Sequence, residues 1–286
     1  MHCTFRHGVR AVVAAAVLAG AVGCSGGGSG TAPAVDSTPA VSLPGDAPSS
    51  GAAASPTPTP AQKANFSDAV EVTRLVHIGD YGAAGGMVAD TSPAARHIAH
   101  QIADRRAYEL NGQPVTENES SDVSVDGDNA ASEVHIEIVD GDTTTKYTWK
   151  DFAFDERGKI TAWTGKSGPI DKALWRKSDS ASAHGVTARL ISAYVTNAGT
   201  LVVVVELASP KRAIRVDDAA YTPPDGYRQE DNAGLYTDVG KGEKAMTSFS
   251  FPKAKLGGKV RIELGRVDPN DTSSSWRMGS VTLAVK

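Results

Sequence analysis

A histidine flanked by acidic residues is the clearest candidate for chemistry in this sequence. His135 alternates with Glu133 and Glu137 between apolar residues, so the three polar side chains share one face of an expected strand. An imidazole beside carboxylates can move a proton in general acid–base catalysis. Aromatic residues of the following strands could complete a pocket for a small ligand: Tyr147, Trp149 and Trp163. The alternative is that the polar face of this strand simply meets water.

Two histidines one helical turn apart suggest half of a metal site. His97 and His100 could supply two ligands from one side of a helix. The sequence places no third ligand in register with them, and the aspartates between residues 217 and 238 do not follow the spacing of a calcium loop. We therefore expect both histidines to be solvated, and we expect no metal and no cofactor.

The start of the chain has the features of an export signal. Arg6 and Arg10 precede an apolar run that ends at Cys24 and is shorter than the ~20 residues of a membrane-spanning helix. The other cysteine, Cys3, lies before this run. We expect residues 1–23 to be a removed signal peptide, which excludes a disulfide within the mature chain.

The residues around Cys24 resemble the lipobox of bacterial lipoproteins. Small residues precede the cysteine in Ala21-Val22-Gly23, and Ser25 follows it. The resemblance implies that Cys24 receives a diacylglyceryl thioether, becomes the new N-terminus and anchors the protein to the outer face of the cell membrane. Ala21 stands where the family usually has Leu. Cleavage after the small residues Ala19-Gly20-Ala21 would instead release a secreted protein.

Residues 24–64 have the composition of a disordered linker. Pro, Gly, Ser, Ala and Thr dominate, and Leu43 is the largest apolar side chain. Such a segment buries too little apolar surface to offset the entropy of ordering it. Alternating prolines in residues 55–60 favour the extended polyproline II conformation. We expect a tether between the lipid and the folded part.

The segment of residues 65–177 changes from helical to strand patterning. Asn65 is a candidate helix cap, and Ser92-Pro93 is a cap followed by proline at the first helical position. The helix that starts there is expected to turn an apolar stripe inward: Ala95, Ile98, Ala99 and Ile102. Further on the period becomes two, and the apolar phase slips between Trp149 and Phe152, which predicts a bulge.

This pattern resembles the nuclear transport factor two-like, or cystatin-cone, superfamily. The likeness lies in the helix around Val70–Val76, the Gly79-Asp80-Tyr81 turn, and the hairpin of residues 155–160 before Trp163. It implies an α+β cone, in which helices pack on a curved antiparallel sheet. The superfamily includes enzymes and non-catalytic binding domains, so the fold alone does not define an activity.

Residues 185–286 follow a short polar linker at residues 178–184 and show strand patterning throughout. Leu201–Leu207 is a strongly β-prone run, which predicts a central strand buried on both faces. The short strands and turns resemble the β-sandwich domains of Gram-positive surface lipoproteins. That resemblance implies an all-β, immunoglobulin-like sandwich.

Charge and organisation together limit the function. The chain of 286 residues has a formal net charge of −4, and loss of the signal peptide makes it more acidic, so nucleic acid is not an expected partner. We expect a membrane-anchored exported lipoprotein that acts as a non-catalytic binding or scaffolding module for an unidentified protein or small molecule. The alternative is a small-ligand carrier or an enzyme that acts through the cone pocket of residues 65–177. An interior filled by aromatic side chains favours the first hypothesis, and His135 buried beside a carboxylate favours the second.

Overall fold

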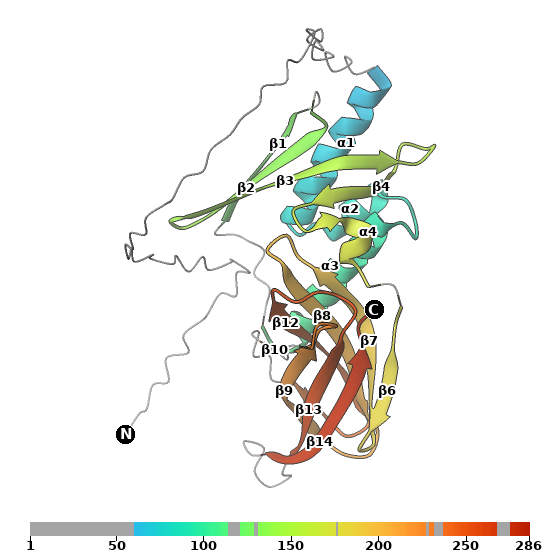
Figure 1. Cartoon of the computed structure of the whole chain (residues 1–286), viewed down its shortest axis with the longest axis vertical. Helices are drawn as coiled ribbons and strands as arrows, with labels where there is room; N and C mark the ends of the chain where they lie inside the picture. The colour runs from blue at the N-terminus through green and yellow to red at the C-terminus, as the bar shows by residue number, and fades with distance from the viewer. Residues whose placement is uncertain are drawn as a thin grey trace, which may run out of the picture.

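The computed structural model describes residues 60–113, 121–128, 131–175, 177–226, 229–231, 237–267 and 275–286. The expected signal peptide, Cys24 and the expected disordered tether up to residue 59 lie outside the described residues. The described chain is mostly β-strand, arranged in three antiparallel sheets with four helices (Figure 1). None of these helices combines the length and the apolar character needed to cross a membrane.

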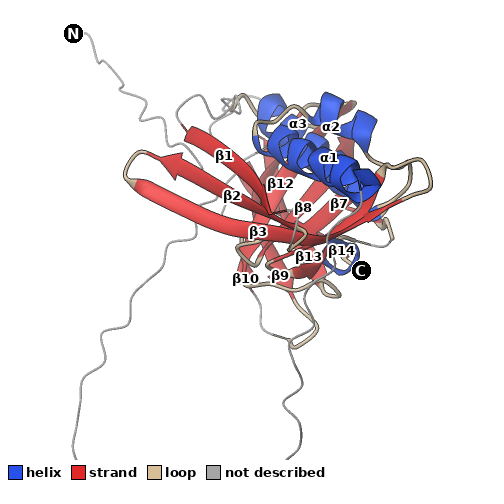
Figure 2. Cartoon of the chain, turned by 90° about the horizontal axis from the view of Figure 1, so that it is seen from above, coloured by secondary structure: helices blue, strands red, loops and turns tan. Residues whose placement is uncertain are grey.

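The helices come early in the chain, apart from one short helix between the sheets. They are α1 (Pro60–His77), α2 (Tyr81–Met87), α3 (Pro93–Leu110) and α4 (Ile170–Ala173). The N-terminal sheet has the order β1-β2-β3-β4-β5, formed by β1 (Ser121–Asp128), β2 (Glu133–Asp140), β3 (Thr143–Phe154), β4 (Ile160–Gly165) and β5 (Gly168–Pro169). Helices α1, α2 and α3 lie together on one side of this sheet (Figure 2).

The C-terminal part consists of two further sheets. The covered sheet, so called because α3 lies on it, has the order β12-β8-β7-β6, formed by β12 (Glu243–Pro252), β8 (Thr200–Ser209), β7 (Val186–Val195) and β6 (Ser180–Ala183). The far sheet has the order β10-β9-β13-β14, with β11 also paired to β9; its strands are β9 (Ile214–Thr222), β10 (Gln229–Glu230), β11 (Asp238–Val239), β13 (Lys259–Val267) and β14 (Ser275–Ala284).

Local sequence signals explain the starts of two helices. Ser92 caps α3 by accepting a hydrogen bond from the Ala95 amide at 3.1 Å, and Pro93 occupies the first helical position, as expected. Asp80 caps α2 in the same way. Helix α1 begins at Pro60 rather than after Asn65, so the expected start was wrong. A proline is tolerated in the first turn because its missing N–H would have no partner there.

The predicted bulge in the N-terminal sheet is confirmed. Lys150 of β3 pairs with Thr164 of β4, and the next pair joins Ala153 to Ala162, so β3 contains one extra residue. Asp151, within this irregularity, has a φ of +54°, a left-handed conformation that Asp tolerates better than most residues. The bulge shifts the phase of the inward side chains after Trp149.

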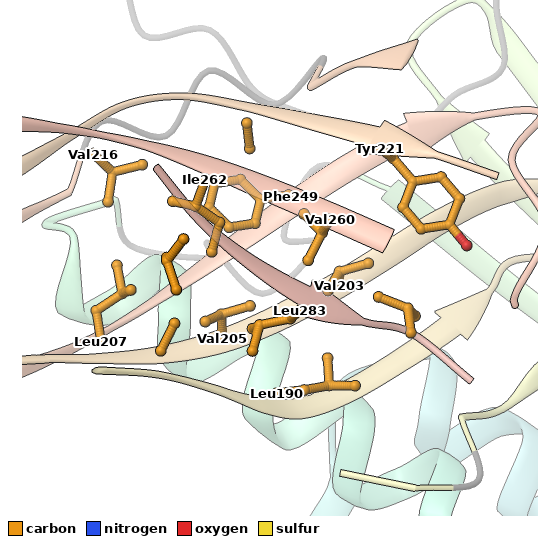
Figure 3. Packing of buried hydrophobic residues seen from close by; sticks show 14 of the residues in the cluster. Leu190, Val203, Val205, Leu207, Val216, Tyr221, Phe249, Val260, Ile262 and Leu283 are labelled. Carbon is orange, nitrogen blue, oxygen red and sulfur yellow. The ribbon is translucent and has the colours of Figure 1, made fainter. Parts of the chain in front are cut away.

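The covered sheet and the far sheet enclose the largest apolar core (Figure 3). Val203 and Val205 of β8 face Val260 and Ile262 of β13 across this core, and Phe249 of β12 fills the space between the sheets. The alternating strand pattern of residues 185–286 therefore translates into two packed apolar faces.

The predicted burial of Leu201–Leu207 on both faces is confirmed, and the cause is a helix from far earlier in the chain. Val203 and Val205 face the core between the sheets, whereas Val204 points to the opposite face. There it packs against Ala103 and Ala107 of α3. A helix thus covers the outer face of the covered sheet.

The predicted fold class, an α+β cone followed by a separate immunoglobulin-like sandwich, is wrong. Most described residues are strand, in three antiparallel sheets, and α3 is shared between them instead of completing one cone. It contacts β4 of the N-terminal sheet and also β7, β8 and β12. An α-helix of 18 residues is about 27 Å long, which is enough to reach both sheets. The prediction had placed α3 on the N-terminal sheet alone because that sheet follows the helix directly in the chain.

The close approach of α3 to the covered sheet gives a stability test. Ala107 is fully buried against Val204, so Ala107→Leu should force the helix away and lower the free energy of unfolding by about 1–3 kcal/mol. Ala99→Leu is the matched control, because Ala99 is exposed on the same helix and the change there should stay within about 0.5 kcal/mol. Urea denaturation at pH 7 measures both, and equal stabilities would contradict the packing.

Candidate functional site

Helix α3 carries two buried histidines. His97 and His100 are only 2% and 1% exposed, so the expectation that both are solvated was wrong. The expected inward stripe was also partly wrong, because Ala99 is exposed and Ile102 is 47% exposed. The inward residues are Ala94, His97, Ile98, His100, Ala103 and Ala107. The side of α3 that faces the interior therefore includes both histidines, because a neutral imidazole can pack in a core as an aromatic ring does.

Aromatic rings of β3, β4 and β7 contact His97, and the rings of His77 and Tyr147 pack beside them. We call this group the aromatic–histidine cluster; it consists of His77, His97, Tyr147, Trp149, Trp163 and Tyr194. Trp149 and Trp163 stack with ring centroids 4.7 Å apart. The ring of His97 stands nearly perpendicular to Trp163 and Tyr194, at 5.4 and 4.6 Å. The cluster joins α1 and α3 to β3, β4 and β7, and so connects the N-terminal sheet to the covered sheet.

Burial keeps His97 neutral. It lowers the pKa of His97 to about 3, with smaller contributions from nearby His100 and His77. Neither ring nitrogen has a hydrogen-bond partner. The perpendicular ring contacts are the geometry in which the edge of one ring meets the π face of another, which partly compensates for the missing partners. His97 therefore serves as an aromatic core residue.

Polar contacts hold the rest of α3 to the covered sheet. A hydrogen bond of 2.9 Å joins Nδ1 of His100 to the hydroxyl of Ser192 on β7. The hydroxyl of Ser248 on β12 donates to Asp104 at 2.5 Å. Burial raises the pKa of Asp104 to about 6, although the hydrogen bond from Ser248 opposes this rise. The end of the helix is held by Asn111, whose Nδ2 donates to the carbonyl of Met246 at 2.9 Å.

The residues expected to line a pocket lie on two faces of the N-terminal sheet. Trp149 and Trp163 are buried in the aromatic–histidine cluster, and half-buried Tyr147 contacts His77 there. His135 is exposed and is hydrogen-bonded to Thr148.

The two flanking glutamates share the face of His135. Glu137 forms an ion pair of 2.6 Å with Lys146, and Glu133 lies opposite Lys150 in the strand register. The structure thus brings the three aromatic residues together and separates them from Glu133, His135 and Glu137.

Two shallow depressions open on the described surface, and neither reaches the aromatic–histidine cluster. One, of about 430 Å³, lies over α2 and α3 and is lined by Tyr81, Ile102, Arg105, Arg106, Glu109 and Leu110. The other, of about 420 Å³, lies on the far sheet and is lined by Asp217, Asp218, Glu263 and Arg277. Glu263 in the second depression is paired with Arg277 and Arg261. Among the described residues, no three His, Cys, Asp or Glu side chains are grouped to hold a metal ion.

Comparison with protein-family models gives no match for this chain, and comparison with curated proteins gives none either. A functional assignment therefore depends on the sequence signals and on the geometry of the α3 region. The burial of His97 and His100 was missed because histidine was treated as a polar residue. The signal that could have revealed it is Leu201–Leu207, since a strand buried on both faces needs a covering element.

The two buried histidines should respond differently to the same substitution. His97→Leu removes two unpartnered nitrogens at similar volume, so the free energy of unfolding at pH 7 should stay the same or rise by up to about 1 kcal/mol. His100→Leu leaves the buried Ser192 hydroxyl without its partner, so this change should lower the free energy of unfolding by about 1–3 kcal/mol. Urea denaturation compares the variants. A larger loss in His97→Leu than in His100→Leu would refute the proposed difference.

Proposed function

We propose that the protein is an exported lipoprotein, anchored through Cys24, whose folded part is a non-catalytic binding or scaffolding module. The observation that carries the non-catalytic part is the separation of the candidate groups across the N-terminal sheet. Trp149 and Trp163 fill the interior, while His135 lies in solvent on the opposite face. General acid–base catalysis needs the titratable group and the bound ligand on the same side.

The anchor part of the proposal rests on the sequence. Cys24 ends a short apolar run, follows small residues and precedes Ser25, as in the lipobox. No other cysteine follows Cys24 in the chain, so disulfide formation within the mature protein does not account for its presence. A single lipid chain binds membranes only weakly, whereas the diacylglyceryl group brings two chains and gives stable attachment.

The intact mass of the mature protein tests the anchor. In a bacterial host that processes lipoproteins, we expect the N-terminus at Cys24 with added diacylglyceryl mass, and recovery in the membrane fraction. Cys24→Ser should abolish the added mass, because the thioether needs the thiol. Cys3→Ser is the control and should leave the mature protein unchanged. Cleavage after Ala21 without added mass would exclude the lipid anchor.

A further inference from the structure

The contact between α3 and the covered sheet depends on few apolar atoms. The buried apolar residues along the second half of the helix are Ala103, Ala107 and Val204, with Ile191 and Met246 beside them. Nearer the start of the helix, Tyr194 of β7 packs on His97 and His100. The much larger core between the covered sheet and the far sheet includes no residue of α3, as far as the chain is described. Loss of the helix would therefore uncover one face of the covered sheet and leave its other face packed.

Titratable groups are concentrated along the inward face of α3. His97 is faced by Tyr194 of β7 and by the indoles of Trp149 and Trp163. His77 of α1, which contacts Tyr147 of β3, is near enough for its charge to act on His97. Among the described residues, no carboxylate is hydrogen-bonded to His97. A proton added to its ring would place a charge among aromatic side chains without a counter-ion.

The second half of the helix adds two more titratable groups at the sheet. His100 is faced by Ser192 and Tyr194 of β7 and by Trp175 after α4. The carboxyl of Asp104 receives the Ser248 hydrogen bond from β12, and its charge acts on Tyr81 of α2 and on Tyr108 of α3, as does that of Asp231 on Tyr108. Two cations of the helix lie near these groups: Arg96 donates to the Trp175 carbonyl, and Arg105 pairs with Glu109 and acts on Tyr81 with a sign opposite to that of Asp104.

We propose that acid releases α3 from both the N-terminal sheet and the covered sheet, while the core between the covered sheet and the far sheet stays folded. A protonated His97 has no polar partner in the docked helix, whereas water solvates it once the helix is released. At the covered sheet the second half of α3 is held by the small apolar contacts of Ala103 and Ala107. At the N-terminal sheet it is held by packing that includes the His97 ring itself, so a charge on this ring opposes docking directly. The docking of α3 thus depends on its two imidazoles staying neutral.

The direction of the pH effect follows from the number of protons that the docked helix and the released helix bind. Burial lowers the pKa of His97 and of His100 from 6.5 to about 3, so both favour docking above pH 6.5 and oppose it as the pH falls. Burial raises the pKa of Asp104 from 3.8 to about 6, so this carboxyl favours docking on acidification. Burial also lowers the pKa of His77, but its ring belongs to α1 and contacts Tyr147 and Trp149 of β3, so the expected slope includes only the groups of α3.

The α3 groups alone set the expected slope. Between pH 6 and pH 4, His97 and His100 each bind a proton in the released helix but not in the docked helix. Over the same range Asp104 binds a proton in the docked helix but not in the released helix. The net uptake of one proton raises the ratio of released to docked helix about tenfold per pH unit.

Hydrogen exchange of the mature chain, residues 24–286, tests the proposal. Peptides of α3 and of β13 are compared at pH 6, 5 and 4 after correction for the intrinsic exchange rate. We expect the opening equilibrium of α3 to rise about 100-fold over this range, while β13 stays protected. The His97→Leu variant should show almost no pH dependence, because one histidine and Asp104 then cancel.

The double variant His97→Leu with His100→Gln gives the sharpest outcome. Asp104 is then the group of α3 whose pKa is shifted within this pH range, so protection of α3 should increase as the pH falls. Gln at position 100 keeps an amide for Ser192, and His97→Leu alone carries the test if the double variant does not fold. His135→Gln, at an exposed histidine, should behave as wild type. Equal losses in α3 and β13, or the same slope in all variants, would overturn the proposal.

Discussion

The docking of α3 on two sheets is the contact on which the rest of this structure depends. Its first half packs His97 among Trp149, Trp163 and Tyr194, and its second half lies on Val204. Tyr194 belongs to β7 of the covered sheet but packs in the core of the N-terminal sheet. One helix and one strand end therefore join the N-terminal sheet to the covered sheet, together with the hydrogen bonds of Lys166 and Ser167 to the turn at Thr196 and Asn197.

This junction combines a well-packed apolar part with a weaker polar part. The stacked indoles and the imidazole of His97 are buried from water. The cluster therefore holds its helices and strands together through buried apolar area and favourable ring packing. Farther along α3, hydrogen bonds to Ser192 and Ser248 replace much of the apolar contact. Hydrogen bonds add only about 0.5–1.5 kcal/mol each, so that half of the helix is held less firmly.

The aromatic and the polar candidate groups of the N-terminal sheet lie in different surroundings. The aromatic side chains that could have lined a ligand pocket pack against each other, and the acidic and basic groups near His135 pair across strands in solvent. Two shallow depressions of the described surface lie over α2 and α3 and on the far sheet, away from the aromatic–histidine cluster.

The sequence by itself determined the local features of this protein. The Ser92 cap, the bulge after Trp149 and the buried strand at Leu201–Leu207 follow from residue type and spacing, because short-range sterics and hydrogen bonds decide them. Tertiary structure alone decided that α3 is shared between sheets and that His97 and His100 are buried. Both depend on contacts between residues about 100 positions apart, and periodicity within one segment carries no information about which distant surface will cover it.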